Sequence, residues 1–241
     1  MGAIRNLIES FDNSKELGQA QREIVENLAR LAESKAEFFD LQISTNLRTA
    51  GSPDNQTVPV EAVLNSETYT HAISSDTVAK IGDTVKSALK SFCSGGKEEI
   101  LNGVGNLITD ALTIFLGSGG ASTGTKKQYY ILTEGWSVVR VDLMAWYLEV
   151  QAQSIRNAMQ KATAFVVVKS AVDLSKIRFN TFLNIYRSQL ASMKLKDDQI
   201  NTALDEAKNI YDRFHETHPQ PLLAEHAPVL ALRGMPGASR S

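Results

Sequence analysis

The chain has 241 residues, enough for one large domain or two small ones, and its 43% of hydrophobic and 22% of charged residues are ordinary for a globular protein. A formal charge of -2 lacks the basic excess of a nucleic-acid-binding protein, so we expect no nucleic acid as a partner. The single cysteine, Cys93, excludes an internal disulfide, and the segment 1–11 lacks the apolar run of a secretory signal. We therefore expect a protein made without a Sec signal peptide, either cytoplasmic or released by a non-classical route.

The first predicted element is a long helix over 14–48. Asn13 and Glu16 form a capping-box-like start. Apolar residues at spacings of three and four, continued by two more near the end, predict one apolar helix face. These residues are Leu17, Ala20, Ile24, Leu28, Leu31, Phe38 and Leu41. Because such a helix is long for an ordinary domain, we expect it to pack along a bundle or in a coiled-coil-like seam.

A loop is predicted over 49–70, where Gly51, Pro53 and Pro59 interrupt regular structure. A helix over 74–92 follows, and the pair of glycines at 95–96 ends it. Cys93 lies at the end of this helix. A helix C-terminus disfavours a thiolate, so Cys93 is a poor nucleophile but a candidate for acylation.

The segment 97–125 is apolar and rich in glycine. Asn102, Asn106 and Asp110 recur every four residues and would form a narrow polar stripe on a helix. Glycines within the segment weaken that helix by roughly 1 kcal/mol each relative to alanine. The segment is either a central core helix or an element that changes conformation and enters a membrane. In the second case the residues that would insert are Leu107, Ile108, Leu112, Ile114, Phe115 and Leu116.

Aromatic residues cluster after this segment. A short β-hairpin near 127–141 is one interpretation of the pattern, with a turn at Gly135, although helical spacing also fits from Val139 onward. Both tryptophans of the chain lie here, and such side chains favour membrane interfaces or aromatic cores. The candidate interface anchors are Tyr129, Tyr130, Trp136 and Trp146.

The remaining elements are predicted as helices over 142–169, 174–193 and 197–215. The run 165–168 has strand-like residues, but helical patterns on both sides favour a buried helix. No proline occurs between Pro59 and Pro219, which also favours helix. We therefore predict a mainly α fold, a bundle of about five to seven helices in one helical domain over 1–218, followed by an extended arm over 219–241.

Motifs for catalysis are lacking in the sequence. The residues at 95–97 do not complete a phosphate-binding loop, and no Gly-x-Ser-x-Gly or His-Glu-x-x-His motif occurs. His215 and His218 are three residues apart, but zinc requires at least a third ligand. We expect no enzyme activity, no cofactor and no metal site.

Two functions follow from these patterns as hypotheses. The first is a membrane-active or lipid-binding protein, toxin-like or pore-forming, that conceals its apolar segment until it meets a membrane surface. In broad design this resembles the α-helical pore-forming toxins, which carry an apolar head between amphipathic helices. The alternative is a structural or interaction protein that forms homo-oligomers through the long first helix and the C-terminal arm. A hydrophobic-ligand carrier is a third interpretation, with a pocket among Phe165, Val167, Phe179 and Phe182.

Overall fold

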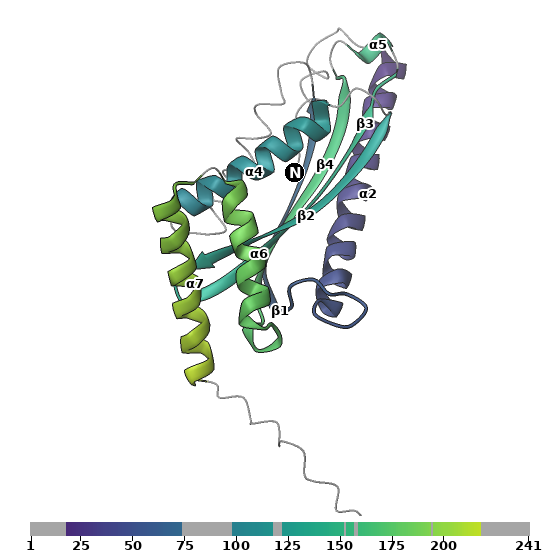
Figure 1. Cartoon of the computed structure of the whole chain (residues 1–241). Helices are drawn as coiled ribbons and strands as arrows, with labels where there is room; N and C mark the ends of the chain where they lie inside the picture. The colour runs from purple at the N-terminus through teal and green to yellow at the C-terminus, as the bar shows by residue number, and fades with distance from the viewer. Residues whose placement is uncertain are drawn as a thin grey trace, which may run out of the picture.

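The computed structural model describes residues 18–73, 98–117, 122–151, 153–156, 159–193 and 195–217. The predicted helix over 74–92, Cys93, and the arm over 219–241 lie outside these residues. Figure 1 shows how the described elements are arranged. The helices are α2 (Gln19–Thr49), α4 (Glu98–Gly117), α5 (Gln153–Arg156), η1 (Leu174–Lys176), α6 (Phe179–Ser192) and α7 (Asp197–Thr217), and the strands are β1 (Val60–Ile73), β2 (Thr123–Glu134), β3 (Ser137–Glu149) and β4 (Lys161–Val172).

The four strands form one antiparallel sheet in the order β1-β4-β3-β2. β2 and β3 make a long hairpin whose two connecting residues are Gly135 and Trp136. Gly135 has a φ of 58°, the backbone conformation that a two-residue hairpin loop requires and that glycine adopts without strain. The hairpin is much longer than the short one considered over 127–141, and it is part of a larger sheet.

The helix predicted over 142–169 is wrong. β3 and β4 occupy most of this range, separated by the short helix α5. Both are central strands with helices over both faces of the sheet, so the side chains from Val138 to Tyr147 and from Ala162 to Ser170 are all buried. A strand buried on both faces loses the alternation of apolar and polar residues that identifies a strand in a sequence, and its apolar run resembles a buried helix.

The loop predicted over 49–70 is also partly wrong, because β1 begins at Val60 and continues to Ile73. β1 is an edge strand, and most of its side chains from Glu61 to Thr68 are exposed. Its pairing with β4 is irregular at two places near its start. An exposed and irregular edge strand has no apolar run to mark it in the sequence.

One face of the sheet is covered by α2. Three alanines of α2 lie against the sheet, and small side chains allow a helix to lie close to the strands beneath it. The buried residues of this helix are Val25, Ala29, Ala32, Ala36, Phe39, Ile43 and Leu47. On the sheet side the layer is formed by alternate residues of β3 and β4, including Trp146 and Val166. In Figure 1, α2 lies to the right of the sheet with no other described helix outside it.

The opposite face carries α4, α6 and α7, which share one core with the sheet. The helices expected over 174–193 and 197–215 are present as α6 and α7. A Cβ atom added to Gly103 of α4 would lie 2.8 Å from the Met193 sulfur, so this glycine lets α4 approach the end of α6 closely. The described residues therefore form a sheet between two helical layers, an α/β fold, and the predicted all-α bundle is wrong.

Candidate functional site

The residues proposed for membrane insertion lie on α4, whose apolar face packs on the sheet. Every fourth residue from Ile100 to Leu116 is buried in the main core, which places Ile108 and Leu112 among the buried side chains. Leu107 and Phe115 are partly buried against the same core, and only Ile114 is largely exposed, at 71%. In this conformation α4 serves as a core helix.

Among the four candidate interface anchors, one is exposed. Trp136 is 74% exposed at the turn between β2 and β3. Trp146 is buried and donates a hydrogen bond from Nε1 to the Thr123 hydroxyl at 3.0 Å. Tyr130 is buried, which raises its pKa to about 12, while Tyr129 is half-buried under the Arg140 guanidinium. These four side chains do not form one surface.

The described residues form no membrane-spanning helix, no metal site and no open pocket at the positions considered for a hydrophobic ligand. None of the described helices combines the length and apolarity needed to cross a membrane. The described part of the chain also contains no group of three or more His, Cys, Asp or Glu residues that could hold a metal ion. The residues proposed as a ligand pocket are packed rather than open: Phe165 stacks on Tyr69 at 4.7 Å between ring centroids, and Phe182 stacks on Tyr186 at 5.9 Å.

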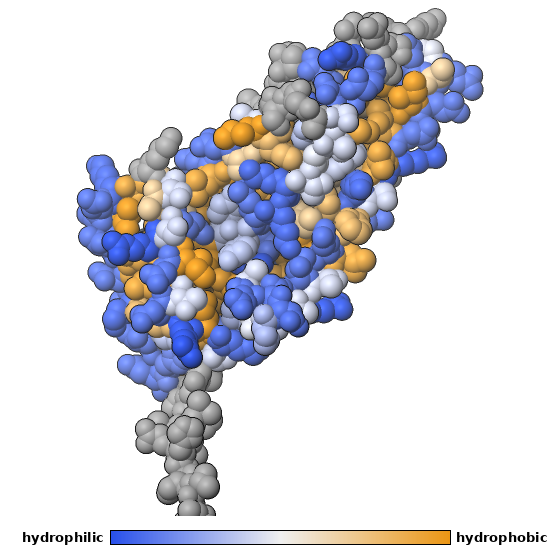
Figure 2. Space-filling view, turned by 45° about the vertical axis from the view of Figure 1, so that its right-hand side comes forward, coloured by the Kyte–Doolittle hydropathy of each residue, from blue (hydrophilic) through white to orange (hydrophobic). Residues whose placement is uncertain are grey.

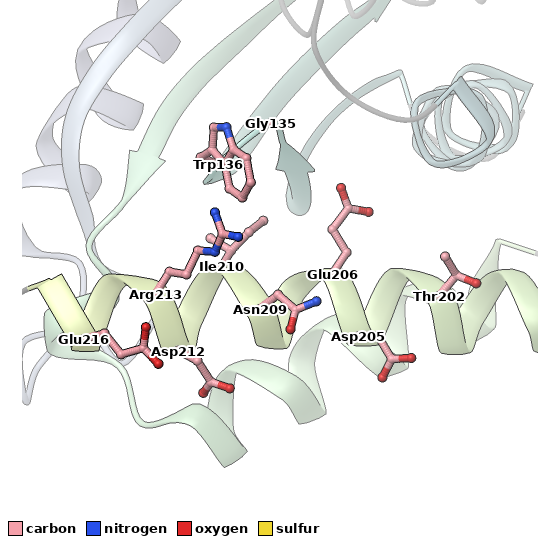
Figure 3. A pocket seen from close by; sticks show the side chains of 10 residues that line it. All are labelled: Gly135, Trp136, Thr202, Asp205, Glu206, Asn209, Ile210, Asp212, Arg213 and Glu216. Carbon is pink, nitrogen blue, oxygen red and sulfur yellow. The ribbon is translucent and has the colours of Figure 1, made fainter.

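A hollow of about 720 Å³ lies between the hairpin turn and α7 (Figure 3). The Arg213 guanidinium lies 4.1 Å from the centre of the Trp136 ring. Figure 3 shows the Arg213 side chain extending from α7 toward Trp136. Four carboxylates line the hollow and give it a negative surface, but they are spread around an exposed helix. The Arg213 guanidinium already occupies the face of the Trp136 ring. These carboxylates belong to Asp205, Glu206, Asp212 and Glu216.

The structure contains a buried ion pair on β3 that the sequence patterns did not predict. Arg140 donates two hydrogen bonds to the Asp142 carboxylate, at 2.7 and 2.8 Å, and a third to the Val58 carbonyl at 2.7 Å. Burial raises the pKa of the Asp142 carboxyl, and the Arg140 guanidinium opposes that rise. The pair ties the centre of the sheet to the chain between α2 and β1. The signal was available, since two opposite charges two residues apart lie within an apolar run and share one face of a strand, but the helix predicted over 142–169 separated Asp142 from Arg140.

The apolar helix face predicted for the first helix is the most unusual surface of the described residues. The structure buries a different face of α2, so most of the predicted residues that it describes are exposed, whereas Leu28 is partly buried against the core. Ile24, Leu31, Phe38 and Leu41 are 36, 39, 54 and 63% exposed. Figure 2 shows orange side chains in a broken line down the right-hand side of the molecule, where α2 lies. We call these four residues the outer row.

The outer row follows a heptad pattern. Ile24, Leu31 and Phe38 are seven residues apart, and Leu41 follows three residues later. In heptad notation the first three occupy position a and Leu41 occupies position d, the positions that face the partner in a coiled coil. Asn27 and Ser34 occupy the other d positions of the row, and both are exposed. The row therefore has the form of a coiled-coil seam about 27 Å long that no described element covers.

A comparison with protein-family models finds no match, and a search of curated proteins finds none either.

Proposed function

We propose that this protein is a non-catalytic interaction protein that self-associates through the outer row of α2. The observation that carries the proposal is the exposure of four large apolar side chains on one line of a single helix. Their burial removes apolar surface from water, at roughly 25 cal/mol per Å², and a partner is needed because the sheet lies on the other side of the helix. Heptad spacing favours a second helix as that partner.

A second copy of the chain is the occupant that these residues fit. The outer row has the spacing that matches another outer row, and an interface built from the same patch on two copies closes with two-fold symmetry. Exposed charges of both signs flank the row, including Arg30 and Glu37, which are one heptad apart. The α2 surface can therefore complement itself in both shape and charge.

The two functional hypotheses drawn from the sequence bear differently on this proposal. The proposal keeps the long first helix as the assembling element, whereas the arm over 219–241 lies outside the described residues and its contribution is open to a deletion test. Membrane insertion would require α4 to remove Ile108 and Leu112 from the core of the sheet. Self-association requires no such rearrangement, so it is the function we put forward.

Sedimentation equilibrium at about 1 to about 200 µM tests the proposal, since this range covers weak interfaces. We expect the wild-type chain to show a reversible monomer–dimer equilibrium. The double variant Leu31→Gln, Phe38→Gln should stay monomeric, because it replaces the centre of the row with polar side chains.

The matched control is Ile114→Gln, which changes an apolar residue that is even more exposed than Leu31 and Phe38 and lies on a helix outside the row. It should dimerise like the wild type. A wild-type chain that remains monomeric over the whole range, or a double variant that dimerises normally, would contradict the proposal.

A further inference from the structure

We propose that the second copy lies antiparallel along α2, so that Arg30 of each copy pairs with Glu37 of the other. This inference rests on the proposed self-association and specifies how the partner binds. It follows from two independent properties of the helix surface: the sizes of the side chains in the outer row and the charges beside it.

The sizes of the side chains in the outer row favour the antiparallel pair. In an antiparallel coiled coil, a positions of one helix face d positions of the other. The register that sets Ile24 against Leu41 of the second copy also sets Leu31 against Ser34 and Phe38 against Asn27. Each large side chain in the centre of the row then meets a small or polar one, which fills space without a clash.

A parallel pairing in register distributes the same residues less favourably. Like positions would then face each other, so Asn27 would meet Asn27 and Ser34 would meet Ser34 in the apolar seam. Polar pairs at such positions are tolerated at a cost in stability. Both registers place Asn27 and Ser34 in the seam, but the antiparallel one sets each against a large side chain and avoids placing Phe38 against Phe38.

The charged residues beside the outer row also favour the antiparallel pair. Glu23, Arg30 and Glu37 follow one flank of the row at intervals of seven residues, and all three are exposed. In the antiparallel register this flank lies beside the same flank of the second copy. Arg30 of each copy then meets Glu37 of the other, so the contact occurs twice across the two-fold axis. In a parallel pair the flank instead lies beside the opposite flank of the partner helix, which carries Lys35. Arg30 of each copy would then meet Lys35 of the other, and two pairs of like charges would result.

Arg30 is available for such a contact. Its only ion pair within the described residues is with Glu26 on the same helix, at 3.6 Å, and both side chains are well exposed. An exposed pair of this kind contributes little to stability, so the guanidinium can turn toward a partner at little cost.

Charge reversal tests the orientation directly. Arg30→Glu and Glu37→Arg, studied separately by sedimentation equilibrium, should each weaken homodimerisation by about tenfold or more, because each variant places two like-charged pairs at the interface. An equimolar mixture of the two variants should dimerise about as strongly as the wild type. In the mixed dimer both charges at the interface of one chain are negative and both charges of the other are positive, so each contact joins opposite charges. The exposed reversal Lys196→Glu, away from α2, is the control and should leave association unchanged.

The possible outcomes separate this inference from the proposed function. A parallel dimer predicts that Arg30→Glu strengthens association, because the new carboxylate at position 30 would meet Lys35, and that result would overturn the antiparallel arrangement alone. Dimerisation that depends on Leu31 and Phe38 but not on either charge would also overturn it while leaving self-association intact. A monomeric wild type would instead remove the proposed function itself. Thermal unfolding of each single variant verifies that it is folded.

Discussion

At the scale of single residues, two features fix the strands at the centre and the edge of the sheet. Arg140 and Asp142 form an ion pair within the buried layer beneath α2, and Arg140 also donates a hydrogen bond to the Val58 carbonyl. On α6, the Gln189 side chain exchanges two 2.6 Å hydrogen bonds with the backbone N–H and C=O of Ile131 on β2. Because β2 is an edge strand, this amide takes the place that a further strand would fill.

The ion pair gives a prediction about stability. Asp142→Asn should lower the free energy of unfolding by about 3–5 kcal/mol, because it leaves the Arg140 charge buried without a counter-charge. The double variant Arg140→Met, Asp142→Leu should lose less than that, since it removes both charges and keeps the space filled. Urea unfolding measures both values. A double variant less stable than the single one would show that the pair is essential as a pair.

At the scale of elements, α2 carries two apolar faces with different compositions. The buried face has three alanines between residues 29 and 36, followed by the large residues Phe39, Ile43 and Leu47, whereas every residue of the outer row is large and remains exposed. Sequence rules select the face with the largest residues, so they identify the outer row instead of the buried one. The physical reason is that close packing on a sheet rewards small side chains, and these contribute little to an apolar pattern.

α4 gives the prediction at this scale. Leu112→Asp should destabilise the fold by more than about 4 kcal/mol, because it places an unpaired charge in the core, where Leu112 is 2% exposed. Ile114→Asp, two residues further along the same helix, should change stability by no more than about 0.5 kcal/mol. Urea unfolding of the two variants is the measurement. Equal stability of both would contradict the placement of α4 as a core helix.

At the scale of the whole molecule, the two faces of the sheet are covered unequally. A helix is about 10–12 Å wide, whereas four strands span about 19 Å, so α2 alone cannot cover its face. It lies mainly over β4 and β1. The β2 residues on the uncovered part of that face, Thr125 and Lys127, are exposed and polar. Among the described elements α2 is the helix that packs on this face, and its outer row is exposed to solvent.

The buried position of α4 also predicts behaviour with membranes. We expect no release of entrapped dye from anionic vesicles, because insertion would require α4 to give up the core contacts of Ile108 and Leu112. Vesicle flotation with a dye-release assay measures this for the intact chain. Leakage that is lost when Ile114 and Phe115 are both replaced by serine would instead support the membrane-active hypothesis.

Apolar spacing in the sequence correctly predicted the helices α6 and α7 and a long first helix, and a hairpin turn at Gly135 was one of two interpretations that it left open. The same spacing also contains the four residues of the outer row, whose role in assembly is our proposal. Only the tertiary structure decided that 142–149 and 161–172 are strands, because burial on both faces removes the alternation that reveals a strand. It likewise decided which face of α2 meets the sheet and placed Arg140 against Asp142. These properties depend on contacts between distant segments, which local spacing does not record.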